Sequence, residues 1–417
     1  MASAASLSEP RVLAHAKRRL FPEDGDQNAY AVVDTQFSTA EWLAERSVPP
    51  SIRERLAPFN HVRVGSGYPD LVGVRSLDSE LLAVGRFGDR PPLVAVEAKG
   101  YTTGGTVDAE RGVVQAYDRL GEANAAYVAA PLAAVSRTDR TLACELNVGV
   151  LGVEPDGTVT PLERPRVVGN RTADEATAIR FQATAQGVAE KSFGLNHPKN
   201  YLAYPLALYH PDDTEEVLEE RVVGATDSAR TGAAFLGLIE ERPDGVERTP
   251  LGGEVVRFAL DRHGTVDAAL SAFEEWQGSP VRFRELDPAW GAMARRVVWA
   301  YPATRLLVEE LQTMYDDGIV DPSLVDLLEW LAVGHPTFAV ELFVRGTDDA
   351  RSRVLTADGD LRIEELSDGE VFHSPTVFQL KAMLFHAGIL EDRGAEPSRL
   401  DPTTDSWRLR NPLEPLR

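Results

Sequence analysis

The chain has 417 residues, of which 43% are hydrophobic and 26% are charged, as is ordinary for a globular protein. This length predicts two or three domains with full hydrophobic cores. No run of eighteen apolar residues occurs, and residues 1–21 lack the basic and apolar regions of a signal peptide, so neither a membrane span nor a leader is expected. The single cysteine, Cys144, excludes an internal disulfide and a multi-cysteine metal site. We therefore expect a cytoplasmic protein with no membrane partner.

The formal net charge of −22, taken alone, argues against a nucleic-acid partner. The basic residues are almost all arginine, however, because among 43 lysines and arginines lysine occurs only at positions 17, 99, 191, 199 and 381. Abundant acid with scarce lysine resembles halophilic proteins, and an acidic protein from a GC-rich genome is the alternative. Salt near 1 M screens charges beyond about 3 Å, so in the halophilic case net charge says little about partners.

Residues 1–60 read as mostly helical. Ser8 and Pro10 mark the start of a helix with apolar residues at helical spacing, and a second short helix is expected over 38–47. Residues 61–165 alternate short apolar runs with helices, which predicts a mixed α/β sheet flanked by helices. The expected strands are 70–76 and 81–87 as neighbours, then 91–100 and 125–131, with helices at 107–123 and 138–147 and a hairpin over 148–162 that turns at Asp156-Gly157.

Beyond about residue 180 the pattern is helical and contains two similar segments. Residues 232–260 should form a helix, a hairpin turning at 243–245, and a second helix. Residues 376–413 should form a helix, a polar loop and a short strand at 406–410. The eight histidines have no close spacing that would predict a metal site, and His386 is expected in the core.

The stretch "LVAVEAKG", residues 93–100, carries the first chemical signal. Alternate residues of a strand share a face, so Glu97 and Lys99 should lie side by side at the end of an apolar strand. Asp70 begins an earlier apolar run, and if the two runs pair, Asp70 and Glu97 converge. A carboxylate beside a core is costly unless it is paired, so we expect Lys99 or a metal ion to pair these acids.

Two carboxylates and a lysine at one sheet edge suit metal-assisted hydrolysis of a phosphodiester. Mg²⁺ binds through one or two carboxylates, keeps several waters and bridges to phosphate. Such an ion neutralises phosphate charge and makes a coordinated water more acidic. The Lys99 amine would steady the developing charge and orient the attacking water.

Pro69-Asp70 and Glu97-Ala98-Lys99 resemble the PD-(D/E)xK phosphodiesterase superfamily, the fold of many restriction endonucleases. The resemblance covers residues 60–165 and extends to the leading helices. It implies a restriction-endonuclease-like α/β core, a Mg²⁺ or Mn²⁺ site at Asp70 and Glu97, and catalysis by Asp70, Glu97 and Lys99. Gln115 matches the glutamine that such proteins often carry on the next helix. The family's acidic residue on the first helices would be Glu9, Glu41 or Glu45.

Structural alternatives exist for each of these residues. Pro69-Asp70 could be a turn before a strand, Glu97 and Lys99 a solvated pair on an edge strand, and Gln115 a surface residue. Lys99 is one of only five lysines, and arginine cannot replace a compact catalytic ammonium, which favours function.

The two C-terminal segments resemble winged helices, which bind duplex DNA or mediate protein contacts. Arg242 and Arg248 flank the first hairpin, and Lys381, Arg408 and Arg410 belong to the second segment; these five are the candidate DNA contacts.

We therefore expect a nuclease-like domain over 1–170, a winged-helix-like module over 180–265, and a helical region over 266–417 that ends in a second such module. The predicted function is a metal-dependent DNA endonuclease of the restriction, defence or repair type. Duplex DNA is the expected partner, with a homodimer if both strands are cut and with a protein partner as a further option for the modules. The alternative is a winged-helix DNA-binding regulator or defence component whose nuclease-like domain is structural.

Overall fold

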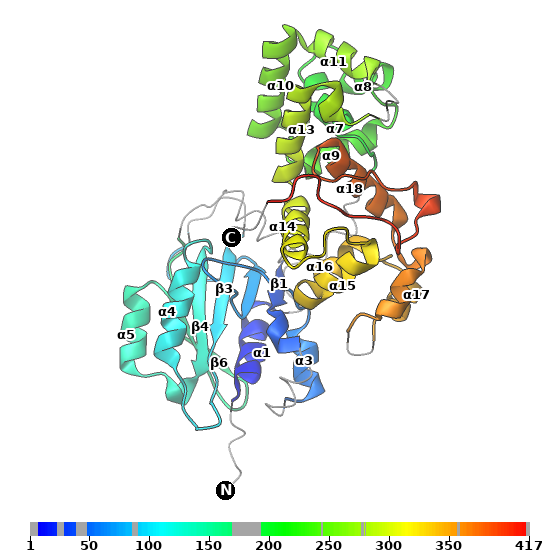
Figure 1. The fold of residues 1–417 in the computed structure, drawn as a ribbon. Helices are drawn as coiled ribbons and strands as arrows, with labels where there is room; N and C mark the ends of the chain where they lie inside the picture. The colour runs from blue at the N-terminus through cyan, green and yellow to red at the C-terminus, as the bar shows by residue number, and fades with distance from the viewer. Residues whose placement is uncertain are drawn as a thin grey trace. The chain divides into compact units, whose positions relative to one another are not determined.

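The computed structural model describes residues 7–22, 29–38, 48–85, 91–168, 193–242, 245–276, 279, 281–356 and 359–413. The chain divides into two compact units (Figure 1). The first unit comprises Met1–Gln186 with Val333–Phe338, and the second comprises Gly187–Ala332 with Ala339–Arg417. The domain boundaries expected from the sequence stay predictions.

Within its described residues, the first unit is built on a six-stranded mixed sheet with strand order β1-β2-β3-β4-β5-β6. The first three strands are antiparallel to one another, β3, β4 and β5 are parallel, and β6 returns antiparallel to β5. The strands are β1 (Tyr30–Val33), β2 (Leu71–Val74), β3 (Leu93–Ala98), β4 (Ala125–Pro131), β5 (Gly149–Val153) and β6 (Val159–Glu163).

Helices cover both faces of this sheet (Figure 1). On one face α1 (Glu9–Leu20) and α3 (Pro50–Leu56) pack against a core that contains the β3 residues Val94, Val96 and Ala98. On the other face α4 (Ala109–Arg119) and α5 (Arg137–Glu145) pack against β4 and β5. Because each face of β3 and β4 is buried, these strands are apolar runs rather than alternating ones.

The expected strands at 91–100 and 125–131, the helices at 107–123 and 138–147, the first helix and the 148–162 hairpin are confirmed. The described part of residues 1–60 is mostly helical, as expected, but it also contains strand β1, which was not expected. One expectation is wrong: the strand expected at 81–87 is absent from its described part, 81–85, where the only pairing is an isolated bridge at Val84. Leu81 and Leu82 are buried, but their backbone N–H groups donate to Asp78 in a turn, so the neighbours of β2 are β1 and β3. Of the expected helix over 38–47, residues 39–47 lie outside the described residues, and Thr35–Ser38 is a 3-10 turn (η1).

The second unit is mostly helical, as expected. A two-stranded hairpin, β7 (Ile239–Arg242) with β8 (Gly245–Arg248), follows α9 (Thr226–Phe235) and leads into α10 (Pro250–His263). The remaining helices that begin after residue 193 are α7 (Pro198–Ala207), α8 (Thr214–Arg221), α11 (Val266–Glu275), α12 (Phe283–Leu286), α13 (Pro288–Ala300), α14 (Pro302–Asp316), α15 (Leu324–Gly334), α16 (Pro336–Phe343), α17 (Asp348–Val354) and α18 (Ser374–His386).

The helix–hairpin–helix order expected over 232–260 is confirmed, and of its turn residues 243–244 lie outside the described residues. In the last segment the helix is confirmed as α18, but the strand expected at 406–410 is wrong. There the chain makes only isolated bridges, at Ser406 and Leu409. Trp407 between them is fully buried, and its backbone N–H donates to Pro322, so the pairing changes partner within a few residues. In the described part of the chain, no helix combines the length and apolarity needed to cross a bilayer.

Candidate active site

Asp70, Glu97 and Lys99 come together at one end of the sheet. Strands β2 and β3 pair with Leu71 opposite Val96, which places Asp70 opposite Glu97 one step further along. Val72 and Val74 share a buried cluster with Leu93 and Ala95 and not with Val94 or Val96. Since side chains alternate along a strand, the three site residues lie on the same face, as the sequence predicted.

The Asp70 carboxylate is held by two donors. Its Oδ2 accepts a hydrogen bond from the backbone N–H of Ala98 at 2.6 Å, and its Oδ1 accepts one from Gln36 Nε2 at 3.2 Å. The residue is only 4% exposed. The first bond ties Asp70 to the end of β3, so its position relative to Glu97 is fixed by the sheet itself.

Glu97 is 3% exposed and has two cationic neighbours. Its Oε1 accepts from Arg119 Nε at 2.9 Å, and its Oε2 lies 3.9 Å from Lys99 Nζ. Arg119, the last residue of α4, is itself buried and also donates to the carbonyl of Val64 at 2.9 Å. The two carboxylate oxygens therefore face different cations: one a fixed guanidinium, the other a lysine ammonium.

The pKa values of both carboxyl groups are raised. Burial is the main cause for each. The charge of Glu97 raises the pKa of Asp70 further, and the charge of Glu9 raises both, while Lys99 lowers both and Arg119 lowers that of Glu97. Two ionised carboxylates in one buried place repel each other, so the site favours a bound proton or a bound cation.

Lys99 lies between β3 and α4. Its backbone N–H donates to Ala129 in β4 at 2.8 Å, and its side chain runs over Gly112 of α4. A Cβ added at Gly112 would come within 2.9 Å of Lys99 Cγ, so a larger residue there would displace the lysine. The Lys99 side chain is 16% exposed, and its ammonium lies 3.9 Å from Glu97 Oε2.

Gln115 lies on α4 between Gly112, which contacts Lys99, and Arg119, which contacts Glu97. Positions three or four apart share a helix face, so Gln115 faces the same side as these two residues. Its Oε1 atom is buried and accepts no hydrogen bond. The structure therefore brings Gln115 to the margin of the site, where its Oε1 accepts no hydrogen bond from the other three residues.

The end of α4 also fixes the turn that leads to Asp70. The carboxylate of Asp118 accepts from the backbone N–H and hydroxyl of Ser66 at 3.0 and 2.6 Å. Glu122 accepts from the backbone N–H of Gly65 at 2.8 Å. Gly65 has φ +67°, and a Cβ there would meet the carbonyl oxygen of Asp118 at 2.9 Å, which requires glycine.

Of the three acidic residues considered for the first helices, Glu41 and Glu45 lie outside the described residues. Glu9 is the first residue of α1, whose start packs on Gly100 directly after Lys99; a Cβ on Gly100 would lie 2.0 Å from the Glu9 backbone nitrogen. Its charge acts on both Asp70 and Glu97. Glu9 is therefore the acid of the three that the structure locates near the site.

A divalent ion fits the donor set of Asp70 and Glu97. No group of three or more His, Cys, Asp or Glu side chains able to hold a metal occurs among the described residues. A hard cation such as Mg²⁺ is nevertheless commonly held by one or two carboxylates, with water and substrate phosphate as its other ligands. Burial raises the pKa of both carboxyl groups, and the charge of Glu97 adds to the shift of Asp70; a bound cation would stabilise both ionised carboxylates.

The candidate DNA contacts of the first hairpin are exposed arginines. Arg242 is paired with Glu240 and Glu247 at 3.3 and 3.1 Å. The guanidinium of Arg248 lies 4.9 Å from the ring centroid of Tyr209 and lines a hollow of about 810 Å³ between the hairpin and α10. Arg248 is therefore the more available of the two for an external anion.

The three candidates of the last segment differ in access. Arg408 is exposed, and Arg410 is exposed and paired with Glu285 at 3.3 Å. Lys381 is 0% exposed, and its ammonium donates to Asp405 at 2.6 Å in the interior. A buried, paired ammonium is unavailable to a DNA phosphate, so the expectation of a DNA contact at Lys381 is corrected to a structural ion pair.

Sequence reasoning missed Arg119 and Gln36. Arg119 is four residues after Gln115 and therefore on the same face of α4, a signal that the helical period contained. Gln36 follows a strand that was not foreseen, so nothing in the sequence pointed to its bond with Asp70. Comparison of the chain with protein-family models, with curated proteins and with solved structures gives no match.

Proposed function

We propose that the chain is a metal-dependent DNA endonuclease with a restriction-endonuclease-like core, as its resemblance to the PD-(D/E)xK superfamily implies. The observation that carries the proposal is the convergence of Asp70, Glu97 and Lys99 on one face at the end of neighbouring strands β2 and β3. All three residue types of the motif are present. The raised pKa values of both carboxyl groups support the proposal, because perturbed acids cluster at functional sites.

In this proposal Asp70 and Glu97 hold Mg²⁺ or Mn²⁺. The bound ion would neutralise charge on the scissile phosphate and increase the acidity of the attacking water. Asp70 keeps its orientation through the Ala98 N–H and Gln36, and Arg119 keeps Glu97 directed toward Lys99. The Lys99 ammonium can then donate to the attacking water and to a phosphate oxygen as negative charge develops. Gln115, with an unpaired amide oxygen at the margin, would orient water.

The second unit would position the substrate through winged-helix-like modules. The α9–β7–β8–α10 order supports this for the first module, with Arg248 the accessible cation. Cleavage of both strands would require two sites and hence a homodimer on duplex DNA. The Asp70/Glu97/Lys99 set is equally compatible with a restriction, a defence and a repair role. A cytoplasmic location is part of the proposal.

A second function class has one observation in its favour. The Glu97–Arg119 pair is buried on both sides, as in a structural ion pair, and occupies one of the two Glu97 oxygens. The chain could then be a DNA-binding regulator or defence component whose nuclease-like unit only supports the fold. In that case the protein binds DNA but does not cut it.

Incubation of supercoiled and linear DNA with the full chain separates these functions. Mg²⁺ and Mn²⁺ are each supplied at low and at high KCl, with an EDTA control. We expect nicked or linear products that require the metal, and none from Asp70→Asn, which preserves shape and removes the charge. An Arg242→Ala/Arg248→Ala variant tests the hairpin, and weaker DNA binding is expected. DNA binding without any metal-dependent cleavage would favour the second class.

A further inference from the structure

Tyr68 and His61 form an aromatic pair beside the candidate active site, which we call the Tyr68–His61 platform. Their ring centroids are 4.5 Å apart with 36° between the ring planes. Tyr68 is two residues before Asp70, and two residues of chain span about 7 Å at most. If a phosphate binds at Asp70, the base of that nucleotide or of the next one can therefore reach the platform.

His61 is fixed by Asp34. Its Nδ1 lies 2.6 Å from Asp34 Oδ2, and Asp34 is buried. The register of β1 with β2, Val33 opposite Leu71, places Asp34 opposite Asp70, and the Asp34 N–H donates to the Asp70 carbonyl at 3.0 Å. A carboxylate at Nδ1 holds the ring in one orientation, and the platform thus lies on the same face as the site.

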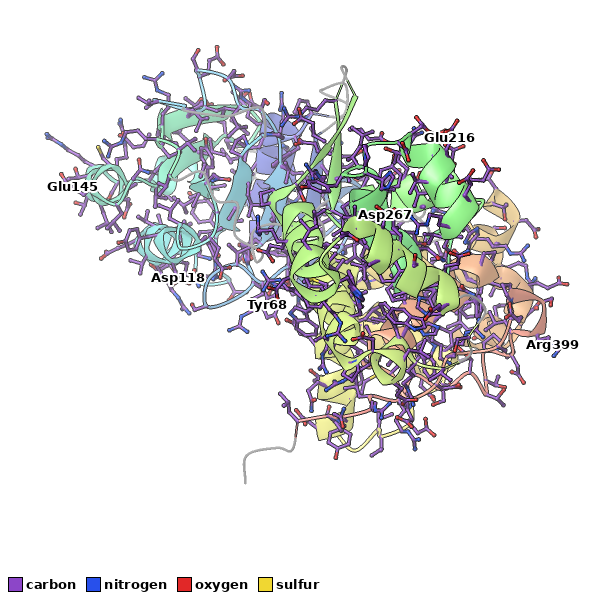
Figure 2. The ribbon with its side chains drawn as sticks, turned by 90° about the horizontal axis from the view of Figure 1, so that it is seen from above. Tyr68, Asp118, Glu145, Glu216, Asp267 and Arg399 are labelled. Carbon is purple, nitrogen blue, oxygen red and sulfur yellow. The ribbon has the colours of Figure 1, made fainter. Side chains whose placement is uncertain are left out.

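Tyr68 is fixed by the chain around it. It follows the Val64–Gly67 turn, which is held by Asp118 and Arg119 at the end of α4 and by Glu122 just after it. It precedes buried Pro69, and a residue before proline favours extended backbone. The Tyr68 ring therefore lies on a supported segment. Figure 2 labels Tyr68 and Asp118, whose carboxylate accepts a hydrogen bond from Ser66, two residues before Tyr68.

The platform is open to solvent. Tyr68 is 49% exposed and the His61 side chain is 33% exposed. Between them, Val62 and Val64 are buried while Arg63 points outward and is exposed. Arg63 has no hydrogen bond or ion pair with any residue that the structure describes. An open aromatic ring next to a free guanidinium combines a stacking surface with a cation for phosphate.

We propose that the Tyr68–His61 platform stacks an unpaired base next to the cleaved phosphate, with Arg63 on the neighbouring phosphate. This inference rests on the proposed function. Aromatic side chains stack on bases whose faces are free, as in single strands. This stacking does not depend on the base sequence, because every base has an aromatic face. In an intact duplex both faces of each base are covered by neighbours. The preferred substrate is therefore nucleic acid with an unpaired base at the site, such as a single strand, a flap or a gap.

The test compares binding of three oligonucleotides of one sequence: a single strand, the perfect duplex, and the duplex with a short gap. Binding is measured by fluorescence anisotropy with Ca²⁺ in place of Mg²⁺. The proteins are wild type, Tyr68→Phe, Tyr68→Leu, Arg63→Gln and the control Tyr117→Leu, which removes an equally exposed tyrosine from α4. Thermal melting of each variant checks that it folds.

Wild type should bind the single strand and the gapped duplex more tightly than the perfect duplex. Tyr68→Leu should lose about tenfold for the two unpaired substrates, the effect of one stacked base, and nothing for the duplex. Tyr68→Phe and Tyr117→Leu should bind as wild type, and Arg63→Gln should weaken all three substrates while lowering the salt dependence.

If wild type and Tyr68→Leu each bind all three substrates with the same affinity and metal-dependent cleavage is intact, the base-stacking role of the platform is wrong and the proposed function still stands. A uniform loss in Tyr68→Leu would also overturn the base-stacking role, since that result indicates a positioning effect on Asp70. Absence of both binding and cleavage in wild type would overturn the proposed function and the platform with it.

Discussion

Replacement of Arg119 should destabilise the first unit strongly. Arg119→Met keeps most of the side-chain length but removes the donors to Glu97 and to the Val64 carbonyl. Glu97 would then be a buried carboxylate whose remaining cationic neighbour is Lys99, with its ammonium 3.9 Å away. Loss of one partner from a buried pair costs about 3–5 kcal/mol, because an uncompensated charge stays behind.

A double-mutant cycle measures the part that belongs to the pair. Arg119→Met/Glu97→Gln removes the stranded charge and should recover about 2 kcal/mol of the loss. The assay is urea unfolding at neutral pH without divalent ions, followed by circular dichroism. Arg111→Met, at an exposed position of α4, is the matched control and should change stability by about 0.5 kcal/mol at most. A cost below about 1 kcal/mol for Arg119→Met, or no recovery in the double variant, would refute the reasoning.

Three further outcomes follow from burial and charge. Asp70→Asn should melt above wild type in EDTA at neutral pH, because its raised pKa makes ionised Asp70 costly in the folded state, and the gain should vanish in acid where both states are protonated. Burial lowers the pKa of His386 from 6.5 to about 4, so the unfolded chain binds the extra proton first. His386 should contribute a loss of about 3 kcal/mol in the free energy of unfolding as pH falls from 6.5 to 4, and His386→Phe should lack this contribution. If the high negative net charge is a halophilic adaptation, the melting temperature should be higher in about 2 M KCl than in about 0.1 M KCl.

Each of these outcomes has a clear opposite. A lower melting temperature for Asp70→Asn in EDTA would show that its charge stabilises the folded chain. An unchanged acid limb in His386→Phe would remove His386 as the cause of acid instability. A melting temperature that is equal or higher at low salt would contradict halophilic adaptation.

The parts of the fold that the sequence predicted well are those with a strong local pattern. Strand β3 is an apolar run, interrupted only by Glu97, between proline and glycine, and α4 has a clear helical period; the structure adds the cap at Asp108. Strand β1 is short and follows a stretch read as helical, and its pairing with β2 is set by tertiary contact. The apolar residues at 81–85 favour a strand, but only Leu81 and Leu82 are buried, and the turn that these two make to Asp78 has no signal in the sequence.

The site was predictable only in its motif. Glu97 and Lys99 share a face by strand alternation, which needs no tertiary information. Arg119 is 22 residues from Glu97 and Gln36 is 34 from Asp70, so these contacts depend on how strands and helix pack. Lys381 illustrates the reverse problem: a basic residue in a sequence gives no sign that Asp405 will bury it.

The most direct test of the nuclease assignment is the single-turnover cleavage rate of Lys99→Ala with Mg²⁺ or Mn²⁺, measured together with its DNA affinity. Lys99 acts mainly on charge that develops in the transition state, so the rate should fall about 100- to 1,000-fold while affinity changes less than about threefold. Lys99→Arg should not restore the rate, because a guanidinium differs in shape from a compact ammonium. Cleavage by Lys99→Ala at the wild-type rate would contradict the mechanism and leave Glu97 and Lys99 as an ion pair at the end of β3.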